Sequence, residues 1–327
     1  MSRSTLAFLL KTLVSLGILS FLLYRMDMAQ LLRVLSSVRL SYVVVALAGY
    51  VLGQILCSIR WSLLARPLGF KNPVRDFAVF YFIGMFFNLF APSTVGGDVG
   101  RVFYLARGGN KTAGQAVKES TISALISVLA DRIIGFAVLA WIGAAALALF
   151  PAYPIPSIVR YLTYGLALAF LGGWMLLPLI GWFLERKEIF GGRNLRTQLD
   201  NYWKDRRIVV ATIVLSLVAH TIQIWMQILL GRAVNIEIPW SYSFIIYPLI
   251  GTFSALPVSL NGIGLREGGY LFLLRLIDVS SEKAIAFSLL WFLIVALDSL
   301  IGGIVFIVRK SPRPSAIASD IIKDRSG

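Results

Sequence analysis

The sequence contains few of the residues on which water-soluble chemistry depends. It has one cysteine, Cys57, and one histidine, His220, in 327 residues. An intrachain disulfide is therefore impossible. Charged residues make up 14% of the chain, against about 25% in an average soluble domain. The motifs HExxH, CxxC and GxSxG are absent, and the glycine-rich stretches match neither a Walker loop nor a dinucleotide fingerprint. We predict no catalytic residue set, no metal and no cofactor.

Long apolar runs dominate the sequence instead, and hydrophobic residues make up 58% of it. A hydrocarbon core of about 30 Å needs about 20 apolar residues in a helix. The runs of that length are 6–24, 42–65, 120–149, 161–184, 208–230 and 284–308. Lys11 interrupts the first run, so we interpret it as a retained helix and not a cleaved signal peptide. The sequence predicts an all-α polytopic membrane protein, with 1–327 as a single transmembrane domain.

Two further apolar stretches, 77–107 and 241–277, are interrupted by proline and clustered glycine. Proline removes a helix hydrogen bond, and clustered glycines favour non-helical backbone. We predict that each stretch is a re-entrant hairpin of two half-helices, shielded from lipid at its broken centre. The backbone residues expected at the breaks are Pro92, Gly96, Gly97, Pro257, Asn261, Gly262 and Gly264.

The net charge of +15 indicates contact with anionic lipid headgroups, because the lysines and arginines lie in short loops beside apolar helices. No basic-aromatic module for nucleic acid is present. If both hairpins enter and leave on one side, most lysines and arginines lie on the side of the two termini. We therefore predict a cytoplasmic (inner) membrane location with cytoplasmic N- and C-termini. The three arginines within 25–40 do not fit this pattern, and that segment is interpreted as an interfacial helix.

The two broken stretches resemble each other. P-S-T-V-G-G-D-V-G-R, starting at Pro92, aligns with P-V-S-L-N-G-I-G-L-R, starting at Pro257, at an offset of 165 residues. The identical positions are Pro92 with Pro257, Gly97 with Gly262, and Arg101 with Arg266.

The order of elements also repeats, which predicts two structural repeats at 1–150 and 151–310 and a short cytoplasmic tail at 311–327. Each repeat holds three spanning helices and one broken hairpin. Because three is odd, the second repeat is inverted relative to the first, which is a common arrangement in transporters.

Several ionisable residues are expected at membrane depth, where each costs about 2.5–3.5 kcal/mol on insertion scales. Asp131 follows Arg101 by 30 residues, and Asp298 follows Arg266 by 32. We predict two equivalent ion pairs, Arg101 with Asp131 and Arg266 with Asp298.

Asp131 and Arg132 are sequence neighbours, so on a helix they point about 100° apart and cannot pair well. Arg132 therefore needs another partner. Glu267 or a lipid phosphate is expected to fill that role.

Arginines beside free glycine N–H groups suit an anion such as a lipid phosphate. The predicted phosphate ligands are Arg101, Arg132 and Arg266. The predicted charge partners or proton-coupling groups are Asp98, Asp131, Glu267 and Asp298. The alternative is that these pairs only brace the hairpins. His220, Gln223 and Gln227 share one helix face, which fits helix packing or the polar lining of a path.

The two motifs, with D-R at 131–132 and R-W at 60–61, resemble signatures of the lysylphosphatidylglycerol synthase transmembrane (flippase-like) family. In fused members of that family, the membrane part is regarded as moving aminoacylated phosphatidylglycerol to the outer leaflet. A soluble domain makes that lipid, and we expect no such domain here because the chain ends about 18 residues after the last run. The resemblance implies lipid handling, by transport of an aminoacylated, anionic, polyprenyl-linked or hopanoid lipid. The residues that it implies as site residues are Pro92, Gly96, Gly97, Asp98, Arg101, Arg132, Pro257, Gly262, Gly264, Arg266 and Glu267.

The leading hypothesis is therefore a lipid translocator with membrane lipids as partners. The alternatives are a membrane-embedded lipid-modifying transferase and a non-transporting partner of a lipid-synthesis enzyme. For the transferase, acid–base groups would have to come from Asp98, Glu119, Asp131 and Glu267.

Overall fold

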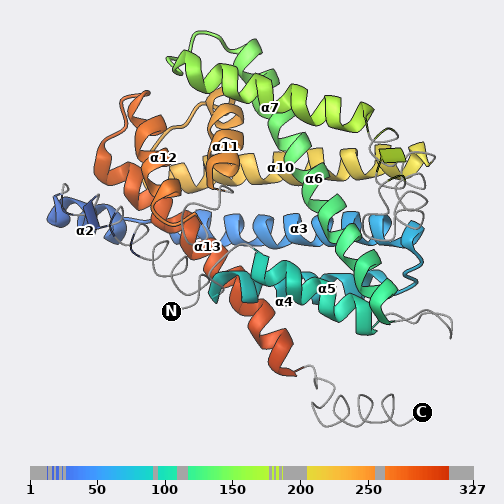
Figure 1. Cartoon of the computed structure of the whole chain (residues 1–327). Coiled ribbons are helices and arrows are strands. Elements are labelled where there is room, and N and C mark those ends of the chain that lie inside the picture. The colour runs from blue at the N-terminus through green and yellow to red at the C-terminus, as the bar shows by residue number, and fades with distance from the viewer. Residues whose placement is uncertain are drawn as a thin grey trace, which may run out of the picture.

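The computed structural model describes residues 27–90, 95–108, 117–176, 205–254 and 262–308, with single positions between 13 and 24 and between 179 and 186. This part of the chain is helical and contains no strand (Figure 1). The helices are α2 (Met28–Ser36), α3 (Leu40–Ala65), the 3-10 turn η1 (Arg66–Leu68), α4 (Val74–Phe90), α5 (Val95–Gly108), α6 (Val117–Leu149), α7 (Ser157–Met175), α10 (Arg206–Ala233), α11 (Trp240–Ser254), α12 (Leu265–Arg275) and α13 (Ser281–Val308).

Five helices of the described residues are long and apolar enough to cross a membrane. They are Leu40–Leu68, Ser120–Leu149, Ser157–Met175, Arg206–Ala233 and Ser281–Val308. The all-α, multi-span prediction is confirmed, while the expected span 6–24 lies mostly outside the described residues. The run 161–184 is shifted, because α7 begins at Ser157 and ends at Met175.

Helices α3 and α10 lie against each other at the centre of the molecule (Figure 1). Gly49 and Gly53 of α3 provide the close approach. A Cβ atom at Gly49 would lie 3.2 Å from Cγ of Met226, and one at Gly53 would lie 2.9 Å from Nε2 of Gln223. Small residues four positions apart let membrane helices pack with their backbones close together. This contact joins the first half of the chain to the second.

The stretch 77–107 forms a helical hairpin of α4 and α5. Gly84 of α4 faces Gly97 and Arg101 of α5, and the Gly97 N–H donates to Oδ1 of Asn88 at 2.8 Å. A side chain at Gly97 would collide with the Gly84 carbonyl oxygen. The prediction that Gly96 and Gly97 lie at the break was wrong, because both are inside α5, and Gly97 is explained by close helix packing. Pro92 lies outside the described residues.

The stretch 241–277 forms the second hairpin, from α11 and α12. Tyr242 of α11 donates its hydroxyl to the Leu273 carbonyl of α12 at 2.7 Å. Before α12, Gly262 and Gly264 have φ angles of 76° and 86°. Side chains disfavour that left-handed conformation, which explains glycine at both positions. Pro257 and Asn261 lie outside the described residues.

Each hairpin packs against the helix that follows the other hairpin. Helix α13 packs on α4, where Gly302 meets the backbone of Phe82, and α6 packs on α11, where Gly143 meets Pro248. The two hairpins are therefore held between α3, α6, α10 and α13, and the site described below lies among these helices.

Two shorter features lie at the edges of this core. Residues 28–36 of the segment expected as an interfacial helix form α2, whose first turn is capped by Oδ1 of Asp27 and which buries only Leu31. Its place at a membrane interface stays a prediction. Arg160 of α7 donates to four carbonyl groups at the end of α6 and in the α6–α7 connection, those of Leu147, Pro151, Tyr153 and Ile155.

Candidate functional site: a charged cavity between the hairpins

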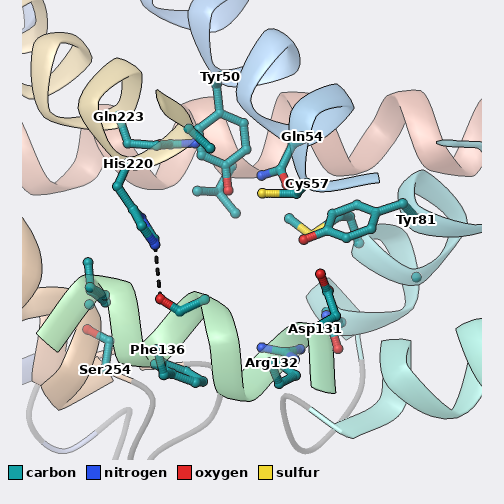
Figure 2. Close-up of a pocket in the computed structure, with 18 of the residues that line it drawn as sticks. Tyr50, Gln54, Cys57, Tyr81, Asp131, Arg132, Phe136, His220, Gln223 and Ser254 are labelled. Carbon is teal, nitrogen blue, oxygen red and sulfur yellow. Dashed lines mark hydrogen bonds between the residues drawn. The ribbon is translucent and has the colours of Figure 1, made fainter. Parts of the chain in front are cut away.

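A cavity of about 350 Å³ lies among α3, α4, α5, α6, α10, α11, α12 and α13. Arg101 from the first hairpin and Arg266 from the second both line it, although 165 residues separate them. Asp98 lines it as well. So do Asp131 and Arg132, which Figure 2 shows. Five of the predicted phosphate ligands and charge partners thus share one cavity.

Asp131 of α6 is held by two guanidinium groups. Its Oδ2 accepts from Nη2 of Arg101 at 2.8 Å, and its Oδ1 accepts from Nε of Arg60 at 2.8 Å. Arg60 also donates from Nη1 to Oγ of Ser216 at 2.9 Å. The Asp131 side chain is 1% exposed. The predicted Arg101–Asp131 pair is confirmed, and the pair extends to Arg60 of α3 and Ser216 of α10.

The guanidinium of Arg101 also lies between two aromatic rings. Its Cζ is 4.2 Å from the ring centre of Trp61 and 4.5 Å from that of Tyr81. The faces of aromatic rings attract a cation, more strongly where water is excluded. Trp61 is itself fixed by an Nε1–H bond to Oγ of Ser127 at 3.1 Å. The ring contacts and ion pairs together hold Arg101 in one orientation.

Arg132 pairs with Asp98 across the α5–α6 contact. Nε of Arg132 is 2.9 Å from Oδ2 of Asp98, and Nη2 is 3.2 Å from Oδ1. Asp98 also accepts from Nη1 of Arg101 at 3.4 Å. The expected Glu267 partner for Arg132 was wrong, because Asp98 lies one helical turn before Arg101 and faces α6. This pair is the most exposed of the ion pairs here, with side-chain exposures of 33% for Arg132 and 19% for Asp98.

At the second hairpin, Arg266 pairs with its sequence neighbour Glu267. Nη2 of Arg266 donates to Oε1 of Glu267 at 2.7 Å, and Nε donates to the same oxygen at 3.1 Å. Glu267 turns back toward the start of α12, where its Oε2 accepts from the Gly264 N–H. That turn brings the carboxylate within reach of Arg266.

Asp298 of α13 therefore lacks the partner that the sequence predicted. It is 0% exposed, and neither of its carboxyl oxygens has a hydrogen-bond partner in the part of the chain that the structure describes. The predicted Arg266–Asp298 pair was wrong, because Glu267 takes the guanidinium. Asp298 does not line the cavity itself, whereas its neighbours Val295 and Ser299 do.

The glycine N–H groups are less free than expected. The Gly97 N–H is bonded to Asn88, and the Gly264 N–H is bonded to Glu267. An anion in the cavity would therefore depend on guanidinium donors. Nε of Arg101 is one donor that is buried without a partner.

The polar face of α10 both packs and lines the cavity. His220 and Gln223 line it, whereas Gln227 donates from Nε2 to the Tyr270 hydroxyl at 2.6 Å. His220 Nε2 lies 3.0 Å from the Gly135 carbonyl (the dashed line in Figure 2), and Nδ1 lies 3.3 Å from the Tyr247 hydroxyl. A carbonyl can only accept, so Nε2 carries a proton.

Sequence reasoning missed Arg60 as a partner of Asp131, although R-W at 60–61 is part of the family resemblance. It is 5% exposed and bonded to Asp131. The available signal was its position inside an apolar run and directly before Trp61. Tyr81 had no comparable sequence signal, because aromatic residues are frequent in the same helix.

The fold and the site define a multi-pass α-helical membrane protein with buried ion pairs around an internal cavity. The chain belongs to the family described as lysylphosphatidylglycerol synthase TM region, whose model matches residues 8–302. A comparison with curated proteins gave no match.

Proposed function

We propose that the protein translocates a phosphate-bearing lipid across the cytoplasmic membrane, with the headgroup in the cavity and the acyl chains in the bilayer. The supporting observation is that the motif arginines of both hairpins, Arg101 and Arg266, line the same cavity. A passage between leaflets needs a polar site reachable in turn from both sides, and such sites commonly lie where two repeats meet.

The charges near the first hairpin favour an anionic headgroup. Among the described residues, the three guanidinium groups of this cluster, those of Arg60, Arg101 and Arg132, pair with two carboxylates, Asp98 and Asp131. The cluster therefore carries one positive charge in excess. Guanidinium groups bind phosphate through paired, charge-assisted hydrogen bonds. One phosphate monoanion would balance the cluster.

The surroundings of Arg132 suit the entry of a lipid from the side. Three apolar side chains close to the Asp98–Arg132 pair in sequence are exposed. They are Val99, Leu129 and Ile133, at 62%, 50% and 53%. In a membrane, these apolar side chains face lipid. The pair lines the cavity and is itself part-exposed, so a headgroup entering between α5 and α6 would meet Arg132 first.

The two halves are proposed to be inverted repeats, 1–150 and 151–310, with both termini cytoplasmic. Gly49 meets Met226 and Arg60 meets Ser216, so α3 and α10 run antiparallel, as equivalent helices of inverted repeats would. Helix α13 packs on α4 of the first hairpin, and α6 packs on α11 of the second. Each hairpin thus contacts the last helix of the other half, which also supports two inverted repeats. Rocking of one half against the other would open the cavity to each leaflet in turn.

Leaflet exchange in proteoliposomes tests the proposal. Purified protein would be reconstituted with labelled anionic, aminoacylated and polyprenyl-phosphate lipids, and the inner-leaflet fraction would be followed by chemical quenching. We expect faster exchange than in empty vesicles for at least one lipid. Arg101→Gln should lower that rate at least tenfold. The control is Arg107→Gln, an exposed arginine of the same helix, which should retain the wild-type rate.

Wild-type rates equal to those of empty vesicles, for all three lipids, would overturn the proposal. Mass spectrometry of the recovered lipids provides a second readout, because a covalently altered lipid would indicate a transferase. In cells, loss of a co-purifying enzyme with unchanged leaflet distribution in Arg101→Gln would indicate a non-transporting partner.

A further inference from the structure

Four carboxyl groups lie in or beside the cavity, and one of them differs from the others. Asp98, Asp131 and Glu267 each accept hydrogen bonds from a guanidinium group. Among the described residues, Asp298 has no hydrogen-bond partner. A buried carboxylate without a partner is strongly unfavourable, so a group in this position takes up a proton and becomes neutral. These surroundings favour the neutral acid at Asp298.

The charge of the site depends on that proton. Four guanidinium groups line the cavity, those of Arg60, Arg101, Arg132 and Arg266. Among the described residues, Asp98, Asp131, Glu267 and Asp298 would balance these charges if all four carboxyl groups were ionised, and no net charge would then remain to attract an anion. With Asp298 neutral, the site keeps one positive charge. Protonation of Asp298 and binding of a phosphate monoanion should therefore favour each other, and such coupling is reciprocal.

The helices packed against α13 offer few positive charges that could neutralise Asp298 in place of this proton. On α3, the Tyr50 hydroxyl lies within electrostatic range of both Asp298 and Arg266. On α12, Arg266 and Glu267 are bonded to each other. On α10, His220 is bonded to Gly135.

The remaining two neighbours of α13 are α4 and α2. On α4, the Tyr81 ring lies against Arg101 at the first hairpin. On α2, Arg33 is exposed and bonded to a carbonyl of its own helix. Within the described residues, no cation pairs with Asp298.

We propose that Asp298 is a proton-binding site that couples lipid movement to the proton gradient, so that one proton accompanies each phosphate-monoanion lipid. The inference rests on the proposed lipid translocation and names its energy source. The proton binds to the Asp298 carboxylate on one side of the membrane and leaves it as a free proton on the other, and no other bond changes. Because the proton offsets the lipid charge, the complete step moves no net charge through the membrane potential.

The transport test compares exchange with and without a pH gradient. One proton per lipid allows a pH difference of one unit to drive up to a tenfold difference in lipid between leaflets. We expect wild-type protein to build such a difference, and a potassium diffusion potential alone to have little effect. Asp298→Asn should abolish the response to the gradient. The control is Glu282→Gln, a carboxyl at the start of the same helix, which should respond as wild type does.

The outcomes separate the two proposals. Absence of any lipid exchange by wild type would overturn the translocation proposal. Wild-type exchange that is independent of the pH gradient would overturn only the proposal that Asp298 is the proton site. A response to the gradient that persists in Asp298→Asn would do the same. A response to a sodium gradient in place of the pH gradient would also overturn it, because the ligand would then be a metal cation.

A binding measurement that does not need transport completes the test. Infrared difference spectroscopy between neutral and alkaline pH reports the carbonyl stretch of a protonated carboxylic acid. We expect one such band in wild-type protein and in Glu282→Gln, and its loss in Asp298→Asn. An unchanged band in Asp298→Asn would overturn the assignment, even if that variant moves no lipid.

Discussion

At the residue scale, the contrast between Asp131 and Asp298 shows how partners decide what a buried carboxyl can do. The two residues occupy similar places in their helices, each about 30 residues after a motif arginine. Both are almost completely buried. Asp131 is bonded through both oxygens to guanidinium groups, whereas Asp298 is bonded to none. The ion pairs fix Asp131 as a structural charge, whereas proton exchange is what we propose for Asp298.

This contrast predicts opposite effects of one type of substitution. Asp131→Asn should lower the free energy of unfolding by about 3–5 kcal/mol, because two buried guanidinium groups lose a counter-charge: Arg60 its carboxylate partner, and Arg101 the closer of its two. Asp298→Asn should change it by less than about 1 kcal/mol, because the amide resembles the neutral acid. Thermal unfolding of the detergent-solubilised variants measures both. Equal destabilisation by the two substitutions would contradict the assigned protonation of Asp298.

At the element scale, glycines decide how closely the half-helices approach. Gly97 faces the backbone of Gly84, and Gly302 faces the backbone of Phe82. By contrast, Gly172 and Gly173 have no atom near a potential Cβ. A pair of adjacent glycines in a membrane helix is thus not sufficient to identify a packing contact.

The first hairpin offers a matched pair of glycine substitutions. Gly97→Ala should destabilise the fold by about 1–3 kcal/mol or more, since its Cβ would overlap the Gly84 carbonyl and the Asn88 side chain. Gly100→Ala lies one turn later and would meet only Phe87 at 3.5 Å. It should be neutral, or stabilising by up to about 1 kcal/mol through helix propensity. Thermal stability measured by fluorescence-detected size exclusion compares them, and an equal loss would refute the close-packing explanation.

Arg160 provides a second prediction at this scale, because one side chain holds the connection between α6 and α7. Its guanidinium donates to four carbonyl groups within residues 147–155. Arg160→Ala should cost about 1.5–3 kcal/mol, in the range of hydrogen bonds from a charged donor, and should speed proteolysis of this connection. Arg232→Ala, at an exposed arginine in the last turn of α10, is the control. Unchanged cleavage in Arg160→Ala would contradict the role.

At the scale of the whole molecule, the contact between α3 and α10 joins the two halves. Gly49 and Met226 meet there, so a cysteine pair at these positions should form a disulfide in a Cys57→Ser background. Val44→Cys with Val210→Cys is the control, because the antiparallel helices place these positions at opposite ends. Gel mobility after mild oxidation measures the cross-link. Efficient cross-linking of the control pair would contradict the antiparallel packing.

The same cross-link tests whether the halves move. If rocking of the repeats carries the lipid, fixing α3 to α10 at Gly49 and Met226 should slow leaflet exchange, and reduction should restore it. Full exchange by the cross-linked protein would show that movement at this contact is not required.

Much of the architecture follows from the sequence, since it depends on local properties. Apolar runs of sufficient length predicted the spans from 42 onward, with end errors of up to three residues for four of them. The run 161–184 was less accurate, because that helix begins at Ser157 and ends at Met175. Proline and glycine predicted where the two hairpins interrupt their helices, and helices do end at Phe90 and Ser254. The Arg101–Asp131 pair was also predictable, because a charge in an apolar helix needs a partner and the spacing offered one.

Only the tertiary structure decided which partner each remaining charge takes. It paired Arg60 with Asp131, Arg132 with Asp98 and Arg266 with Glu267. The rotation of each helix and the turn of a side chain at a helix start set these choices, and hydrophobic periodicity does not encode them. Asp298 is left without a partner for the same reason. The sequence determined that charges enter the membrane, and helix packing determined which of them are neutralised.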